Sequence, residues 1–89
     1  MINLTSPQQL TDIKNGIVIF TDKGLCSDRL IDELDGVKNV FNADVNTEVG
    51  KNLKTAFAIE YVPSAIFIRS GRLSTPVQGV NAILRGAEC

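Results

Sequence analysis

Two short apolar runs constrain the fold of this chain more than any other feature. The first run, Gly16 to Phe20, is apolar and rich in β-branched residues, and the second run, Ala65 to Ile68, has the same character. Runs of this length are typical of strands that are covered on both faces. Between them, the segments 30–36 and 47–60 carry apolar residues at helical spacing. This alternation predicts an α/β protein with a central sheet.

The expected elements follow the order βαβαβαββα. The expected strands are residues 2–4, 16–20, 37–44, 65–68 and a weaker one at 73–77. The first helix is expected to begin with Ser6 as N-cap and Pro7 at its first position. The other helices are expected to run to Gly36, over 47–60 and after Gly79. We therefore expect a single domain, residues 1–89, with a mixed sheet flanked by helices on both faces.

The composition excludes several classes of function. Nine basic and ten acidic residues give a net charge of -1 without a basic stripe, so we expect no nucleic-acid partner. The chain has no histidine and two cysteines, which are too few for a zinc site, so we expect no metal. No apolar stretch has the length that a bilayer needs, and residues 1–5 do not resemble a signal peptide. We expect a cytoplasmic protein without membrane contact.

The segment Phe57 to Ser64 resembles the thioredoxins. That family has an aromatic residue, two apolar positions spaced as aromatic-x-apolar-x-x-apolar and a Pro-Thr pair here. A strand, a basic residue and a glycine follow, and later a Val-x-Gly or Val-Gly element. The matching residues are Pro63, Ser64, the run Ala65 to Ile68, Arg69, Gly71 and Gly79. The resemblance covers nearly the whole chain and implies the thioredoxin fold.

The resemblance also implies that Pro63 follows a cis peptide bond. In such a fold the backbone of Val62 would present an N–H and a C=O to an extended peptide, which is a form of strand addition. The residues alone leave another interpretation open, because a proline can also simply open a strand.

The chain departs from that family between residues 21 and 30. Thioredoxins and glutaredoxins carry Cys-x-x-Cys before this helix, with one thiolate that attacks and a second that resolves the mixed disulfide. Here one cysteine is present, Cys26, and the tetrad is either Leu25 to Asp28 or Cys26 to Arg29. In the first alignment, Thr21 and Gly24 stand where thioredoxins have tryptophans, and Ile19 stands where they have a buried acid.

Cys26 has two interpretations. It is either a reactive monothiol at a helix N-terminus or a small, partly buried side chain that fills the helix start. Ser27 and Asp28 are explained as capping or first-turn residues, and Lys23 and Arg29 as solvated cations or as ligands for the carboxylates of glutathione. Cys89 is expected to be an incidental thiol in the tail. A dithiol reductase that pairs Cys26 with Cys89 is the least favoured hypothesis.

Two hypotheses of function follow. The first is a binding module without turnover, monomeric or weakly dimeric and without a cofactor, that holds a protein or extended peptide. Its expected binding residues are Thr21, Lys23, Gly24, Leu25, Ser27, Asp28, Arg29, Val62, Pro63 and Gly79. The second is a monothiol exchanger in which Cys26 attacks a disulfide and glutathione or another thiol resolves the product. Either way, we expect the conventional dithiol cycle to be absent.

Overall fold

A computed structural model describes residues 1–88 of the chain. Its elements are β1 (Ile2–Asn3), the 3-10 helix η1 (Pro7–Asp12), β2 (Gly16–Thr21), α1 (Leu25–Glu33), β3 (Val40–Asp44), α2 (Glu48–Ala56), β4 (Ser64–Arg69), β5 (Arg72–Leu73), β6 (Val77–Gln78) and α3 (Val80–Glu88). Cys89, for which we predicted an incidental thiol, lies outside the described residues. No helix among residues 1–88 is long and apolar enough to cross a membrane.

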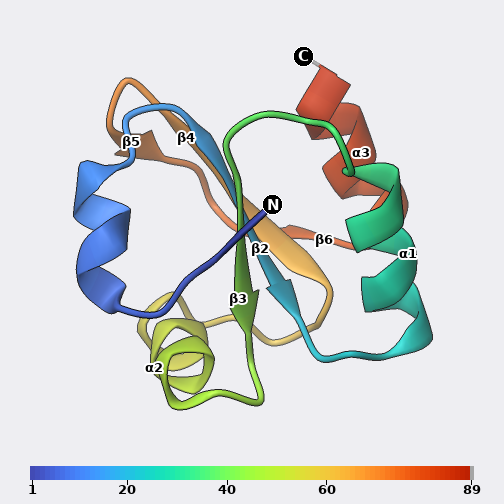
Figure 1. Ribbon diagram of the computed structural model, residues 1–89, viewed down its shortest axis with the longest axis horizontal. Coiled ribbons are helices and arrows are strands. Elements are labelled where there is room, and N and C mark those ends of the chain that lie inside the picture. Colours follow the sequence, from blue (N-terminus) through green and yellow to red (C-terminus); the bar gives the residue numbers. More distant parts are fainter. Residues whose placement is uncertain (89) are drawn as a thin grey trace.

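The central sheet is mixed, as predicted (Figure 1). Its core order is β1-β3-β2-β4, in which β1, β3 and β2 are parallel and β4 runs antiparallel to β2. The far side of β4 is shared, because β6 pairs with its first half and β5 with its second half.

Helices cover both faces of the sheet, with η1 and α2 on one face and α1 and α3 on the other (Figure 1). The alternation of side chains along β2 explains why both faces need a cover. Val18 and Phe20 belong to the core under η1 and α2, while Ile17 and Ile19 belong to the core under α1 and α3. These four side chains are at most 8% exposed, which confirms that β2 is a strand buried on both faces.

Several predicted boundaries are wrong, each for a local reason. The first helix has the predicted Ser6 cap and Pro7 start, but it is a 3-10 helix of six residues. The strand predicted over 37–44 begins at Val40, because the N–H of Val37 still bonds to the carbonyl of Leu34 at the end of α1. The helix predicted over 47–60 ends at Ala56, because Ala58 adopts a left-handed conformation (φ 54°).

The strand predicted over 73–77 is interrupted. It forms two short strands, β5 and β6, separated by residues 74–76. Pro76 has no N–H to donate to a ladder. The hydroxyl of Ser74 instead accepts a hydrogen bond from the N–H of Phe67 at 2.9 Å. The edge of β4 is therefore covered by two short strands rather than one.

Candidate functional site at the start of helix α1

Three loops meet at one end of the sheet, where β2 and β6 end and β4 begins. Phe20 pairs with Ser64, and Ser64 pairs with Gln78, so the residues that follow β2 and β6 lie beside the residue that precedes β4. The N–H of Gly79 donates to the carbonyl of Pro63 at 3.0 Å, which ties two of the loops together. The Val62–Pro63 peptide bond is cis. The three loops on which we predicted binding residues are thus neighbours in space.

The loop from β2 into α1 is held by its own side chains. A carboxylate oxygen of Asp22 accepts hydrogen bonds from the N–H of Gly24 (2.8 Å) and from the hydroxyl of Ser27 (2.9 Å). The hydroxyl of Ser27 in turn accepts from the N–H of Asp22 at 3.1 Å. The bond from Gly24, followed by the bond from Ser27, holds the pKa of Asp22 below its usual value, and desolvation opposes them. The Asp22 carboxylate therefore joins the loop to the first turn of α1 by hydrogen bonds.

Helix α1 begins at Leu25, earlier than an N-cap role of Ser27 or Asp28 would require. Gly24 is its N-cap, with extended backbone and no side-chain cap bond. Ser27 and Asp28 both lie inside the first turn, so the prediction of an N-cap role for either is wrong, while a first-turn role holds for Asp28. The Asp22 side chain accepts hydrogen bonds from the N-cap residue Gly24 and from Ser27, so that the helix begins between these two residues, at Leu25.

Cys26 is exposed, so the interpretation of a partly buried filler is wrong. The buried side chain of this turn is Ser27, at 0% exposure, and Leu25 on the other side of the cysteine is 89% exposed. An exposed thiol at a helix N-terminus is accessible to a reagent or partner. Ile19, where the resemblance places a buried acid, is itself fully buried.

Two of the predicted binding residues face inward. The Thr21 side chain is 2% exposed and donates to Asn42 at 2.6 Å, and Ser27 bonds within the loop. They support the loop rather than line its surface. Lys23 is exposed, has a left-handed backbone (φ 67°), and its ammonium lies 3.8 Å from the carboxylate of Asp44. The side chains of Asp28 and Arg29 are exposed.

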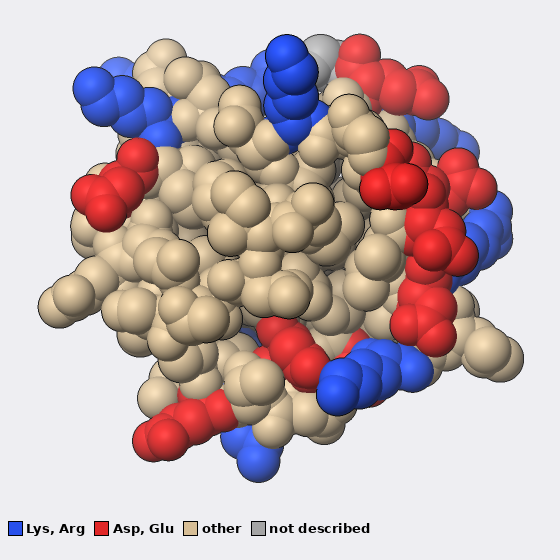
Figure 2. All heavy atoms as spheres, in the orientation of Figure 1, with Lys and Arg blue, Asp and Glu red and all other residues tan. Residues whose placement is uncertain are grey.

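Figure 2 shows acidic side chains gathered on the side of the molecule where α1 lies, while the middle of this face is uncharged. The acidic residues that α1 and the turn after it contribute are Asp28, Asp32, Glu33 and Asp35. The same region also carries Lys23 and Arg29, one on each side of Cys26 in the sequence, so the charges beside the thiol are of both signs.

The segment before β4 has free backbone groups. Within residues 1–88, neither the N–H nor the C=O of Val62 has a hydrogen-bond partner. The preceding residue, Tyr61, has its carbonyl held by the hydroxyl of Ser64, while its side chain is 61% exposed. Sequence reasoning missed Tyr61 as a surface residue. Its position next to Val62, in the segment that carries the resemblance, was the available signal.

Among the described residues, no group of three or more Cys, Asp or Glu side chains is placed to hold a metal ion. The site consists of one exposed thiol, two exposed apolar side chains (Leu25 and Tyr61) and the unpaired peptide groups of Val62. Such a set can bind an extended chain, and the thiol can in addition exchange with a disulfide.

The sequence matches no protein-family model and no curated protein. Solved structures resemble the chain over almost its whole length. Thioredoxin from Trypanosoma brucei brucei is 20% identical, with a TM-score of 0.74 over 99% of this chain and 87% of that one. Oxidized thioredoxin O2 from Arabidopsis thaliana is 18% identical, with a TM-score of 0.73 over 98% and 89%. Oxidised thioredoxin from Plasmodium falciparum is 15% identical, with a TM-score of 0.75 over 99% and 95%.

Proposed function

The chain has the thioredoxin fold, and from this premise we propose that it is a binding module that holds an extended segment of a partner protein beside Pro63. The observation that carries the proposal is the pair of unpaired peptide groups of Val62 in a segment flanked by two other loops. A donor and an acceptor on one residue are what a strand needs to add to an exposed backbone. The function proposed is binding without turnover.

Exposed apolar side chains support this proposal. Leu25, the first residue of α1, is 89% exposed, and Tyr61, in the loop before β4, is 61% exposed. Large side chains of this kind bury area against a partner, and aromatic residues are enriched among those that dominate binding energy. Because Leu25 and Tyr61 are the exposed apolar residues of the site, the partner segment is expected to be apolar.

A peptide selection tests the proposal. Decapeptides selected from a random phage-displayed library on the Cys26→Ser variant should lose affinity for Leu25→Asp and Tyr61→Asp by at least about tenfold. Val37→Asp is the matched control, because Val37 is another exposed apolar residue (41%) and lies between α1 and β3, at the opposite end of the sheet. Selected peptides that bind all three variants equally well would contradict the proposal.

Monothiol exchange is the second candidate, and the exposure of Cys26 favours it. In this reaction the Cys26 thiolate attacks one sulfur of a disulfide, a mixed disulfide forms, and the other sulfur leaves as a thiolate. A second thiol such as glutathione then attacks the mixed disulfide and releases Cys26. The required oxidant is the disulfide substrate, and the reductant is the second thiol.

Titration of the Cys26 thiol separates the two candidates. Ultraviolet absorbance of the thiolate is recorded against pH in a Cys89→Ser background. A pKa well below the usual value of about 8.5 favours exchange, whereas a value at or above 8.5 excludes a nucleophile activated by its surroundings. Under the binding proposal, wild type and Cys26→Ser bind the selected peptides with equal affinity.

A further inference from the structure

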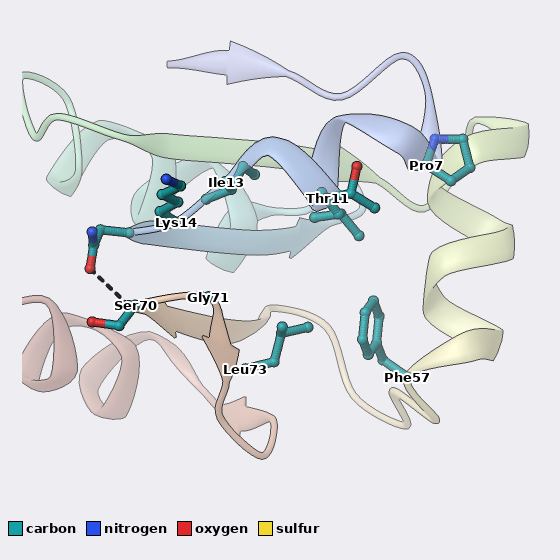
Figure 3. A pocket seen from close by; sticks show the side chains of 10 residues that line it. Pro7, Thr11, Ile13, Lys14, Phe57, Ser70, Gly71 and Leu73 are labelled. Atoms are coloured by element: carbon teal, nitrogen blue, oxygen red, sulfur yellow. Dashed lines mark hydrogen bonds between the residues drawn. The ribbon is translucent and has the colours of Figure 1, made fainter.

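A groove lies near the beginning of β2, at the end of this strand that is away from Cys26. It has a volume of about 840 Å³ and runs between η1, the end of α2 and the β4–β5 turn (Figure 3). The residues that line it are Pro7, Leu10, Thr11, Ile13, Lys14, Asn15, Phe57, Ser70, Gly71 and Leu73. The volume falls within the range of small-molecule sites, about 300–1,000 Å³.

Apolar side chains form the larger part of the groove. Leu10 and Ile13 come from η1 and the residue after it, Phe57 from the end of α2, and Leu73 from β5. Figure 3 shows Phe57 and Leu73 on the side of the groove opposite Ile13. The groove stays open because η1 has six residues and β5 has two, so neither covers this corner of the sheet. Leu73 is left 48% exposed.

Hydrogen-bond donors gather at one end. Two bonds join the residues before β2 to the β4–β5 turn: the N–H of Gly71 donates to the carbonyl of Lys14 (2.9 Å), and the N–H of Ser70 donates to the side-chain oxygen of Asn15 (3.1 Å). These bonds leave the Lys14 ammonium, the Asn15 amide N–H groups and the Ser70 hydroxyl without partners among residues 1–88. All three residues line the groove.

The charge in the groove has one sign. Lys14 is the charged residue among those that line it, and Asp12, the nearest acid in the sequence, is exposed and is not one of them. In Figure 3, Lys14 and Ser70 lie toward one end of the groove, and Pro7 and Phe57 lie toward the other. The groove therefore has a cation and neutral hydrogen-bond donors at one end and apolar walls at the other. This arrangement is complementary to a molecule with an anionic head and an apolar body.

We propose that this groove binds a small amphiphilic carboxylate, with its carboxylate at Lys14, Asn15 and Ser70 and its apolar body between Leu10, Phe57 and Leu73. An extended peptide fits less well, because β5 offers an edge of two residues for strand addition. The groove is distinct from the site at Pro63, and its ligand requires neither Cys26 nor the proposed binding function.

The test uses decanoate below its micelle concentration, followed by ¹⁵N–¹H NMR of the full chain. We expect chemical-shift changes at the amides of Thr11, Lys14, Gly71 and Leu73, and no saturable binding of butyrate, which lacks the apolar body. Lys14→Gln should weaken decanoate binding about fivefold and leave 1-decanol unaffected, because it removes one charge-assisted contact. Lys51→Gln, at an exposed lysine on α2, is the matched control and should change nothing.

Three results would overturn the proposal. The first is that decanoate shifts amides around Pro63 instead of the groove. The second is that Lys14→Gln and Lys51→Gln have equal effects on decanoate binding. The third is that a hexapeptide of alternating Leu and Glu binds the groove more tightly than decanoate with the same dependence on Lys14, which would assign the groove to an acidic protein segment.

Discussion

The segments 21–27 and 61–63 lie side by side but use their polar groups in opposite ways. In the first, the Asp22 carboxylate, the Ser27 hydroxyl and the Gly24 N–H are bonded to one another, and Thr21 is bonded to Asn42. In the second, the peptide groups of Val62 have no partner among the described residues. We call segment 21–27 the closed segment, because its polar groups are bonded, whereas the peptide groups of Val62 are unpaired.

The two segments also differ in the groups that their chemistry would require. The dithiol chemistry needs two thiols on the helix, and this helix carries one cysteine, exposed, with the buried position next to it taken by a serine. Backbone recognition at Val62 needs no particular side chain, because it uses peptide groups. The binding that we propose at Val62 therefore does not require a second thiol on the helix.

The largest expected effect on stability comes from Gly50, a residue of α2 that lies against Asp44 at the end of β3. A Cβ at Gly50 would lie 1.8 Å from the carbonyl oxygen of Asp44, the residue that pairs with Lys23. Gly50→Ala must push α2 away from the end of β3, and we expect it to lower the free energy of unfolding by about 3 kcal/mol. Urea denaturation measures this loss. Lys51→Ala is the control, and equal stability of the two variants would contradict the close packing.

Ser27 lies in the closed segment, and Ser64, the first residue of β4, bonds to Tyr61 in the segment 61–63. Ser27 makes two hydrogen bonds, one of them to a carboxylate, whereas Ser64 donates one bond to the carbonyl of Tyr61. Ser27→Ala should therefore lower the free energy of unfolding by about 2 kcal/mol and Ser64→Ala by about 1 kcal/mol. Both side chains are fully buried, so the pair is matched in burial. The reverse order would show that the closed segment is not the better bonded of the two.

A smaller effect is expected from pH. Because its bonds lower the pKa of Asp22 in the folded state, the ionised carboxylate stabilises the fold above the unfolded pKa, and this contribution is lost as the pH falls through the folded pKa. Wild type should exceed Asp22→Asn in stability at pH 7, and the gap should narrow below about pH 4. Denaturation at several pH values measures the gap. A gap that stays constant or widens in acid would contradict the role of Asp22.

The smallest expected effect on stability comes from the exposed apolar residues. Leu25→Asp and Tyr61→Asp should each change the free energy of unfolding by less than about 0.5 kcal/mol, because both side chains are mostly exposed. Thermal or urea denaturation measures the change. A loss of more than about 2 kcal/mol would show that these side chains serve packing, and their effect on peptide binding would then have a structural cause.

The sequence predicts the sheet better than it predicts the site. The strands β2 and β4 were predictable because burial on both faces leaves a continuous apolar run, and the structure confirms both. The split between β5 and β6 was not, since it depends on how Ser74 replaces a ladder bond. Short strands at an edge have little apolar pattern from which to predict them.

The start of α1 shows why the site was harder to predict. Ser27 is a good N-cap by residue type, but the Asp22 side chain, five residues earlier, sets the helix start and draws Ser27 inward. With the helix start at Leu25, Ser27 is the buried residue of the first turn and Cys26 is exposed rather than partly buried. A pattern of apolar residues predicts which face of a helix is buried only to within about one residue. Here an offset of one residue decides whether Cys26 or Ser27 is the exposed side chain.

We propose that Val62 presents its peptide groups to an extended partner. Hydrogen exchange of the Val62 amide, measured by NMR in the Cys26→Ser variant with and without a selected peptide, tests it most directly. We predict fast exchange in the free protein and at least about tenfold slower exchange in the complex, because the amide gains a hydrogen-bond acceptor. Unchanged exchange at Val62, in a complex that protects other amides, would contradict the proposed hydrogen bond between the Val62 N–H and the peptide.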